Sequence, residues 1–487
     1  MFPKRLEIER VGISKTGVFA DFIKRNVKVI GDFRHTALLL PVIVFLVCLS
    51  SPGMSLAQEG PAIDTGDTAW MLTSSLLVLM MTIPGLFLFY GGLVRSKNAL
   101  GTFMHSFFIT ALVSIQWVLI GYTLSFGPDI SHMIGGLDWL GLNGVTGAPS
   151  DVWATTIPHN LFMVYQLTFA VITVALITGS FAERAKFSTF IIFVLLWTTI
   201  IYDPLAHWVW GGGWIGAMGA LDFAGGTVVH ISSGAAALAA AIMFGKRIGY
   251  GREPMAPHFL PYSVIGASLL WVGWFGFNAG SAVAANGLAS TAFVTTNTAT
   301  AAAVLGWVFI EWIVRGKPTV LGAASGAVAG LVAITPAAGF VTPMAAIIVG
   351  LGGGIFCFFA VNLRPKLGYD DSLDVVGVHG VGGTWGALAT GLFATTAVNS
   401  AGRDGLFYGN PEQLWIQFLA VVATWAFSFV GTMIILVVLK AVMGLRVSAE
   451  KEVGGLDLGE HGEEAYSGFQ MAHGYGTPEH GVKLTDE

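Results

Sequence analysis

The sequence predicts an all-α polytopic membrane protein, and three observations support this class. Of its 487 residues, 54% are hydrophobic and only 11% are charged, whereas soluble domains carry roughly 25% charged residues. Apolar stretches long enough to span a bilayer recur along the chain between short polar loops. Glycine contributes 64 residues, and small residues let membrane helices approach closely. A soluble enzyme, a disordered scaffold and a nucleic-acid binder are therefore disfavoured.

The amino terminus has the order of a secretory signal peptide. Residues 1–35 are polar and basic, a short apolar run extends from Thr36 to Leu49, and Ser55-Leu56-Ala57 supplies a small-x-small site. The apolar run falls short of the roughly 20 residues that span a bilayer. We expect residues 1–57 to be a cleaved leader, the alternative being an additional uncleaved helix. Either way, residue 58 lies outside, because the basic flank stays in the cytoplasm.

Eleven apolar spans are expected after this leader, within a transmembrane domain at 58–444 that precedes a cytoplasmic tail at 445–487. An odd number of spans places the two mature termini on opposite sides of the membrane. The spans lie at 68–91, 104–126, 159–180, 187–206, 226–244, 261–284, 290–314, 319–336, 342–363, 373–396 and 412–440.

Lysine and arginine residues predict the orientation, because cytoplasmic loops carry an excess of both. Alternate loops hold thirteen of them, whereas the opposite loops hold only Arg403. We expect the basic loops and the carboxyl terminus in the cytoplasm, and the protein in the cytoplasmic (inner) membrane. The thirteen residues are Arg95, Lys97, Arg184, Lys186, Lys246, Arg247, Arg252, Arg315, Lys317, Arg364, Lys366, Lys440 and Arg446.

An inverted repeat accounts for the number of spans: five helices, five related helices and one appended helix. Asp222 lies eight residues before His230, and Asp371 lies eight residues before His379. Each histidine opens the glycine-rich first part of a predicted helix, the fifth and the tenth. Weak internal similarity thus supports the repeat.

Ionisable side chains at bilayer depth usually mark a pathway or a binding site, because inserting them is costly. His230 and His379 could be hydrogen-bonded packing residues, but neutral imidazoles can also line a channel, since each both donates and accepts. They form a poor metal site without further ligands. Asp222 could stabilise a cation from a distance or cap the fifth helix, and capping is the expected direct contact.

Aromatic residues gather near the outer ends of helices three to six. An interfacial aromatic belt would explain them, but a cage for an ammonium-like ion is the alternative, because ring faces attract cations. Ser281 follows Phe277 by four residues and supplies a hydroxyl on the same helix face. The aromatic residues are Tyr165, Phe169, Trp208, Trp210, Trp274, Phe275 and Phe277.

At these residues the chain closely resembles the ammonium transporter (Amt) branch of the Amt/Rh family. The stretch Asp222-Phe-Ala-Gly-Gly-Thr-Val-Val-His230 looks like the family signature. The similarity covers about residues 64–466. Further matching segments are 82–86, 89–92, 182–184, 207–213, 233–234, 245–247, 273–281, 377–380, 444–447 and 455–466.

The resemblance implies a homotrimer of eleven-helix subunits of the ammonium-transporter fold, each with its own pore. It implies an outer recruitment site at Tyr165, Trp210 and Ser281, supported by Asp222. The family generally has phenylalanine at the position of Tyr165, and the added hydroxyl is expected to alter recruitment without abolishing it. The resemblance assigns the remaining pore roles to a gate at Phe169 and Phe277, twin histidines His230 and His379, and a lower wall at Trp274.

The resemblance also implies the activity and the partners. We expect ammonium to be recruited, deprotonated and passed as ammonia through a hydrophobic pore, with the proton either co-transferred or returned. A PII-type regulatory protein is the expected partner at the cytoplasmic face, and neither a cofactor nor a metal is expected. An ammonium sensor with little flux is the main alternative. A membrane enzyme or an Rh-type channel is less consistent with the residues at depth, so the protein is not expected to be an enzyme.

Overall fold

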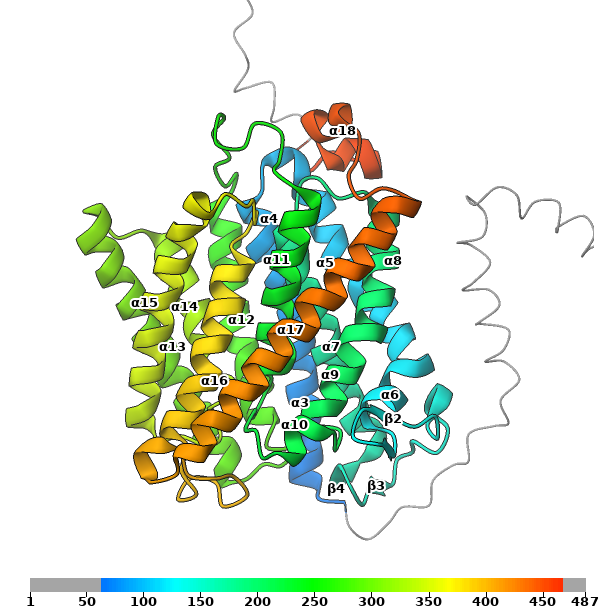
Figure 1. Cartoon of the computed structure of the whole chain (residues 1–487), viewed down its shortest axis with the longest axis vertical. Coiled ribbons are helices and arrows are strands. Elements are labelled where there is room, and N and C mark those ends of the chain that lie inside the picture. Colours follow the sequence, from blue (N-terminus) through cyan, green and yellow to red (C-terminus); the bar gives the residue numbers. More distant parts are fainter. Residues whose placement is uncertain (1–62, 467–487) are drawn as a thin grey trace, which may run out of the picture. The chain divides into compact units, whose positions relative to one another are not determined.

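The computed structural model describes residues 63–466, which form a bundle of long helices (Figure 1). The predicted leader at 1–57 and the end of the predicted tail lie outside the described residues. Each of the eleven predicted spans coincides with a helix or with helices joined in line. Nine helical segments within residues 63–466 are long and apolar enough to cross a membrane, when helices joined in line are counted as one.

The first five spans differ in how continuous they are. Three of them combine two helices that are joined by a short π-helical turn. They are α3 (Thr65–Met80) with α4 (Phe87–Leu93), α5 (Ala99–Gln116) with α6 (Tyr122–Phe126), α7 (His159–Phe181), α8 (Phe187–Trp197) with α9 (Asp203–Val209), and α11 (Ser232–Phe244).

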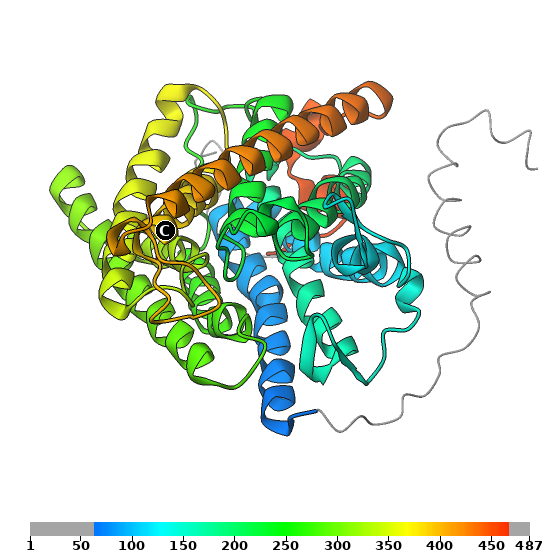
Figure 2. The same ribbon diagram turned by 60° about the horizontal axis from the view of Figure 1, so that its bottom comes forward.

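The second five spans consist of single helices, and α17 follows them. Figures 1 and 2 show α17 lying obliquely across the bundle, where it contacts α8, α11 and α16. The helices are α12 (Leu260–Gly280), α13 (Gly287–Arg315), α14 (Val320–Ile334), α15 (Pro343–Leu367), α16 (Gly382–Phe393) and α17 (Pro411–Val442).

Short elements mark the two ends of the bundle (Figure 1). One end carries two small antiparallel hairpins, and we call it the hairpin end; the other carries α18 (Ala449–Gly454), and we call it the tail end. The elements at the hairpin end are α10 (Trp214–Ala217) and strands β1 (Asp129–Ile130), β2 (Ile134–Gly135), β3 (Pro149–Ser150) and β4 (Ala154–Pro158).

The two histidine-bearing helices begin alike. A π-helical turn opens each of them, Gly226–Ile231 before α11 and Val376–Val381 before α16. The helices then cross at two glycines, because a Cβ atom added to Gly234 would lie 2.3 Å from the Cα of Gly380. This close crossing brings the two histidine-bearing turns together at the centre of the bundle.

Some helices begin or end at other residues than predicted, and at the start of α5 the reason is a hydrogen-bonding residue from a distant part of the chain. The second span was expected from residue 104, but α5 begins at Ala99. Asp457, from the tail, accepts hydrogen bonds from the backbone N–H groups of Leu100 (3.0 Å) and Gly101 (2.8 Å). A carboxylate at a helix N-terminus satisfies donors that have no partner within the helix. The fourth span also continues past residue 206, to Val209.

Candidate functional site

Aromatic residues from three helices meet at the hairpin end. Tyr165 and Phe169 lie one turn apart on α7, with ring centroids 5.0 Å apart. Trp210 ends α9 and presents its ring perpendicular to that of Phe169, at 5.8 Å. Ser281 ends α12, with its Oγ 3.2 Å from the Tyr165 hydroxyl. The structure therefore brings together the three residues expected to recruit the substrate.

The hydroxyl groups of this cluster are oriented by the backbone of α12. The Ser281 hydroxyl donates to the carbonyl of Phe277 at 2.9 Å. Because its proton is committed there, its lone pairs remain to accept an N–H from a bound cation. The Tyr165 hydroxyl lies 2.8 Å from the Phe277 carbonyl and 2.9 Å from that of Gly276. It therefore connects α7 to α12.

Two stacked rings close the path beneath this cluster. Phe169 and Phe277 lie with centroids 4.2 Å apart and ring planes at 28°, and both side chains are buried. A solute can pass them only if a ring moves. Phe275, which belongs to the same aromatic group in the sequence, instead stacks on Phe293 at 3.9 Å.

Asp222 has a capping role in the structure. Its Oδ1 accepts from the backbone N–H groups of Gly225 (2.8 Å) and Gly226 (2.6 Å). Its Oδ2 accepts from the N–H of Thr227 at 2.8 Å and from the hydroxyl of the same residue. Its backbone carbonyl accepts from Nε1 of Trp210 at 2.9 Å. Because the carboxylate oxygens are occupied, Asp222 can act on a cation only from a distance, while its main chain holds the indole.

The two histidines form a hydrogen-bonded pair. Nδ1 of His230 lies 3.2 Å from Nδ1 of His379, and both side chains are buried. One Nδ1 must donate and the other accept, so in two neutral rings the Nε2 atoms have opposite roles. Nε2 of His230 has no hydrogen-bond partner within residues 63–466. A small polar solute could provide one.

Trp274 forms a fixed wall beside this pair. Its ring lies 5.4 Å from that of His230, at 21°, and its Nε1 donates to Oγ1 of Thr335 at 2.9 Å. The Thr335 hydroxyl in turn donates to the carbonyl of Leu331 at 2.7 Å. This chain of hydrogen bonds holds the indole face against the imidazole.

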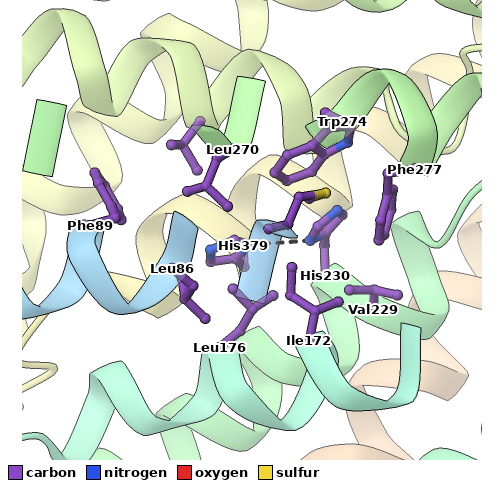
Figure 3. A pocket seen from close by; sticks show the side chains of 12 residues that line it. Leu86, Phe89, Ile172, Leu176, Val229, His230, Leu270, Trp274, Phe277 and His379 are labelled. Atoms are coloured by element: carbon purple, nitrogen blue, oxygen red, sulfur yellow. Dashed lines mark hydrogen bonds between the residues drawn. The ribbon is translucent and has the colours of Figure 1, made fainter. Parts of the chain in front are cut away.

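A narrow cavity surrounds the histidines (Figure 3). Its volume is about 10 Å³, close to the least space that holds one water-sized molecule. Apart from the histidines and the Trp274 ring, the walls are aliphatic, phenyl or thioether groups. The lining residues are Met81, Leu86, Phe89, Ile172, Leu176, Val229, His230, Leu270, Trp274, Phe277, Val328 and His379.

Two further cavities continue toward the tail end. The first, about 60 Å³, shares Phe89, Val328 and His379 with the histidine cavity. The second, about 290 Å³, shares Asp374 with the first and is also lined by Arg364. The path thus widens and becomes charged as it leaves the histidines.

Asp374 was missed by the sequence reasoning. Its side chain lines both tail-end cavities and pairs with Arg364. Asp374 precedes the π-helical turn (Val376–Val381) that opens the span of α16 and so lies outside the spanning helix. Burial raises the pKa of Asp374 to about 7, although Arg364 acts in the opposite direction. The only signal in the sequence was its place between Asp371 and His379.

The fold and the site together define a membrane transporter for a small polar solute. Membrane-crossing helices enclose a narrow path that leads from an aromatic cluster past paired histidines. Within residues 63–466, no group of three or more His, Cys, Asp or Glu side chains is arranged to hold a metal ion.

Comparisons with known proteins identify the family. The Ammonium Transporter Family profile matches residues 69–466. The ammonium transporter of Bacillus subtilis is 58% identical over 402 residues, covering 82% of this chain and 98% of that protein. Ammonium transporter Amt1 of Archaeoglobus fulgidus is 50% identical, covering 82% and 99%. The crystal structure of Candida albicans Mep2 matches with a TM-score of 0.76 at 39% identity, covering 83% and 91%.

The chain therefore belongs to the ammonium transporter family, and its activity is the transport of ammonium across a membrane. The resemblance noted in the sequence is confirmed, and so is the helical membrane fold. A structure titled "Sensor Amt Protein" also matches, with a TM-score of 0.74 at 30% identity.

Proposed function

We propose that the protein recruits ammonium at the hairpin end and passes it inward as ammonia. The observation that carries the proposal is the histidine pair, whose free Nε2 faces a narrow apolar cavity beneath stacked phenyl rings. Ring faces of Tyr165 and Trp210 attract the cation, and the Ser281 hydroxyl accepts one of its N–H groups. These contacts replace part of its hydration shell.

Deprotonation takes place before or at the gate of Phe169 and Phe277. The cavity beyond the gate offers a cation no carboxylate, and burying an unpaired charge in such surroundings is costly. Ammonia is neutral and close to water in size, so it avoids this cost. Potassium cannot lose its charge in this way, and the same step therefore supplies selectivity.

The histidine pair passes ammonia between donor and acceptor. Because the two Nε2 atoms have opposite roles, one accepts an N–H of ammonia and the other donates to its lone pair. Reversing these roles moves two protons: one passes between the two Nδ1 atoms, and another leaves Nε2 of the ring that received it and reaches Nε2 of the other ring, so that both rings stay neutral. This property also suits a pair that transfers a proton, which would make transport electrogenic.

The hairpin end faces outward and the tail end faces the cytoplasm in this proposal. At the tail end, Arg247 contacts Glu183 at 2.8 Å and Asp370 at 2.9 Å, and Arg446 contacts Glu452 at 2.6 Å. Basic residues at this end support a cytoplasmic location. The domain bounds, the cleaved leader and the inner-membrane location remain parts of the same proposal.

We propose a homotrimer and a PII-type regulatory partner at the tail end. The cavity there, lined by Arg247, Glu253, Arg364 and Asp374, offers charged groups to a protein loop. The tail lies against the neighbouring loop, where Glu452 accepts a hydrogen bond from the N–H of Ile248 at 2.7 Å. Large apolar side chains exposed on α13, α15 and α17 provide surface for lipid and for neighbouring subunits.

An ammonium sensor with little flux is the alternative, and the match to the sensor structure gives it a specific basis. Current recorded on solid-supported membranes after ammonium and potassium pulses separates the two. We expect a saturable ammonium current without a potassium current. Internal alkalinisation without current would indicate neutral ammonia conduction, and neither signal from folded protein would favour the sensor.

The double variant His230→Ala/His379→Ala tests the pathway in the same experiment. Removing both rings opens the narrow cavity to water, and we expect the variant to pass potassium. If it still excludes potassium while conducting ammonium, the histidines are not the selectivity element.

A further inference from the structure

The β1–β2 hairpin at the hairpin end contacts the chain segment that carries Trp210. Strands β1 and β2 and the turn between them (residues 129–135) lie at the same end of the bundle as α10 (Figure 1). Nε1 of Trp208 donates to the carbonyl of Met133 at 2.8 Å. A ring nitrogen of His132 donates to the carbonyl of Gly212 at 3.0 Å. These contacts lie on both sides of Trp210 in the sequence.

The strongest contact between the hairpin and this segment is made by Asp129 and His207. Nε2 of His207 lies 2.9 Å from Oδ1 of Asp129, and its Nδ1 lies 3.0 Å from the carbonyl of Ser125. A carbonyl can only accept, so Nδ1 carries a proton. The hydrogen bond with His207 lowers the pKa of Asp129, so that carboxylate accepts as well. Both ring nitrogens of His207 are therefore engaged, one with the main chain of α6 and the other with the hairpin.

The surroundings of this pair contain few other ionisable groups. Nδ1 of His132 lies 3.2 Å from the second oxygen of Asp129. Asp203 lies one turn earlier on α9, and its backbone carbonyl accepts from the Ser125 hydroxyl at 3.3 Å. His207 is fully buried, whereas Asp129 is 30% exposed.

The turn after α9 leaves no room for Trp210 to move independently of this pair. The backbone N–H of Trp210 donates to the carbonyl of Ala206 at 2.8 Å. A Cβ atom added to Gly211 would lie 2.0 Å from the Ser125 carbonyl oxygen and 2.7 Å from Nδ1 of His207. The main chain next to the indole is therefore packed directly against the hydrogen-bonded imidazole.

We propose that the β1–β2 hairpin is a clamp that positions the Trp210 wall of the recruitment site, with Asp129 and His207 as its positioning residues. The inference rests on the proposed function, because it assumes that Trp210 contacts the incoming ammonium. The clamp acts on recruitment and leaves the gate and the histidines in place. Losing it raises the ammonium concentration needed for half-maximal current and leaves the maximal current nearly unchanged.

Ammonium-concentration series on solid-supported membranes test this inference with the full chain. We expect Asp129→Ala to raise the half-saturating concentration about fivefold, within the range of one lost cation–π contact, with a maximal current close to that of the parent protein. Asp129→Asn keeps a polar group within hydrogen-bonding distance of Nε2 of His207, so most of the affinity should return. Asp151→Ala, at an exposed aspartate in the turn of the β3–β4 hairpin, serves as the matched control and should change nothing.

Two further variants keep the test decisive. Trp210→Leu must itself raise the half-saturating concentration; if it does and Asp129→Ala does not, the clamp is wrong and the recruitment site stands. If neither variant has an effect, the recruitment site fails and the clamp with it. Should Asp129→Ala fail to fold, the exposed His132→Ala is expected to raise the value about twofold, as for a weak hydrogen bond. No rise, or an Asp129→Asn defect as large as that of Asp129→Ala, would overturn the clamp.

Discussion

The starts of the two histidine-bearing helices share one design and differ in how completely their acids are hydrogen-bonded. Asp222 accepts from Thr227 N–H, and Asp371 accepts from Val376 N–H, each five residues on and each at 2.8 Å. Asp222 accepts from several further donors. In contrast, Oδ1 of Asp371 is buried without a hydrogen-bond partner in the part of the chain that the structure describes.

The surroundings of the two acids explain this difference. Next to Asp222 lies the indole of Trp210, and the aromatic cluster to which it belongs contains ring faces and the hydroxyls of Tyr165 and Ser281 but no carboxylate. Near Asp371, Arg364 donates to its backbone carbonyl at 2.5 Å and pairs with Asp374. Burial raises the pKa of Asp371 as well. In the proposed topology, the entrance beside Asp222 thus has no free charge, whereas the exit contains a carboxyl group whose charge can change.

Removing Asp222 should have the largest effect, because its carboxylate satisfies several buried donors at once. Two buried donors left unpaired cost about 1–3 kcal/mol each, so we expect Asp222→Ala to lower ammonium flux about 100-fold or more. Asp371→Ala removes a single backbone acceptor and should lower flux about tenfold at most. Flux per folded protein in liposomes, with thermal melting as the check on folding, measures both. Equal losses would contradict the proposed difference between the two starts.

The stacked phenyl rings on the hairpin-end side of the histidines are the second point of contrast. Phe277 stacks on Phe169 above the histidines, whereas Phe89 lines the cavities on the other side. A stacked aromatic pair contributes about 0.5–1.5 kcal/mol, so we expect Phe277→Ala to reduce selectivity for ammonium over potassium about tenfold. Phe89→Ala removes a ring of the same size and should leave selectivity within about twofold. The ratio of ammonium to potassium current measures both effects. A larger loss of selectivity in Phe89→Ala would place the gate on the tail-end side of the histidines and contradict the proposed gate.

These contrasts lie partly within and partly beyond what the sequence predicts. The long apolar helices were predictable because a bilayer requires them, and the histidine pair followed from its spacing and from family resemblance. The cap on α5 could not be predicted, because the carboxylate that forms it belongs to Asp457 in the distant tail. The contact between His207 and Asp129 likewise depends on two loops whose meeting the helix pattern does not encode. Asp374 carried no motif of its own, and only the connected cavities show its place at the exit.

The smallest expected effect is a pH dependence confined to the exit. The pKa of Asp374 is raised to about 7, above the ordinary aspartate pKa near 4. Its contribution to the free energy of unfolding is therefore fully present below pH 4 and is lost as the pH rises through 7. Between pH 6 and 8 on the tail-end side, the exit gains a negative charge that attracts ammonium. One such charge in water contributes on the order of 1 kcal/mol or less, so we expect up to about a threefold gain in apparent ammonium affinity from that side.

Vesicles with a fixed outer pH and a varied inner pH isolate this effect. Asp374→Asn keeps the size of the side chain and removes the charge, so its ammonium affinity from the tail-end side should not vary between pH 6 and 8. Asp404→Asn, at a half-buried aspartate on the other side of the membrane in the proposed topology, provides the matched control and should retain the parental dependence. If the parent protein shows no dependence, or if Asp374→Asn retains it, Asp374 is not the titrating group. The exit would then be as constant in charge as the entrance, and the contrast between the two helix starts would be limited to their hydrogen bonds.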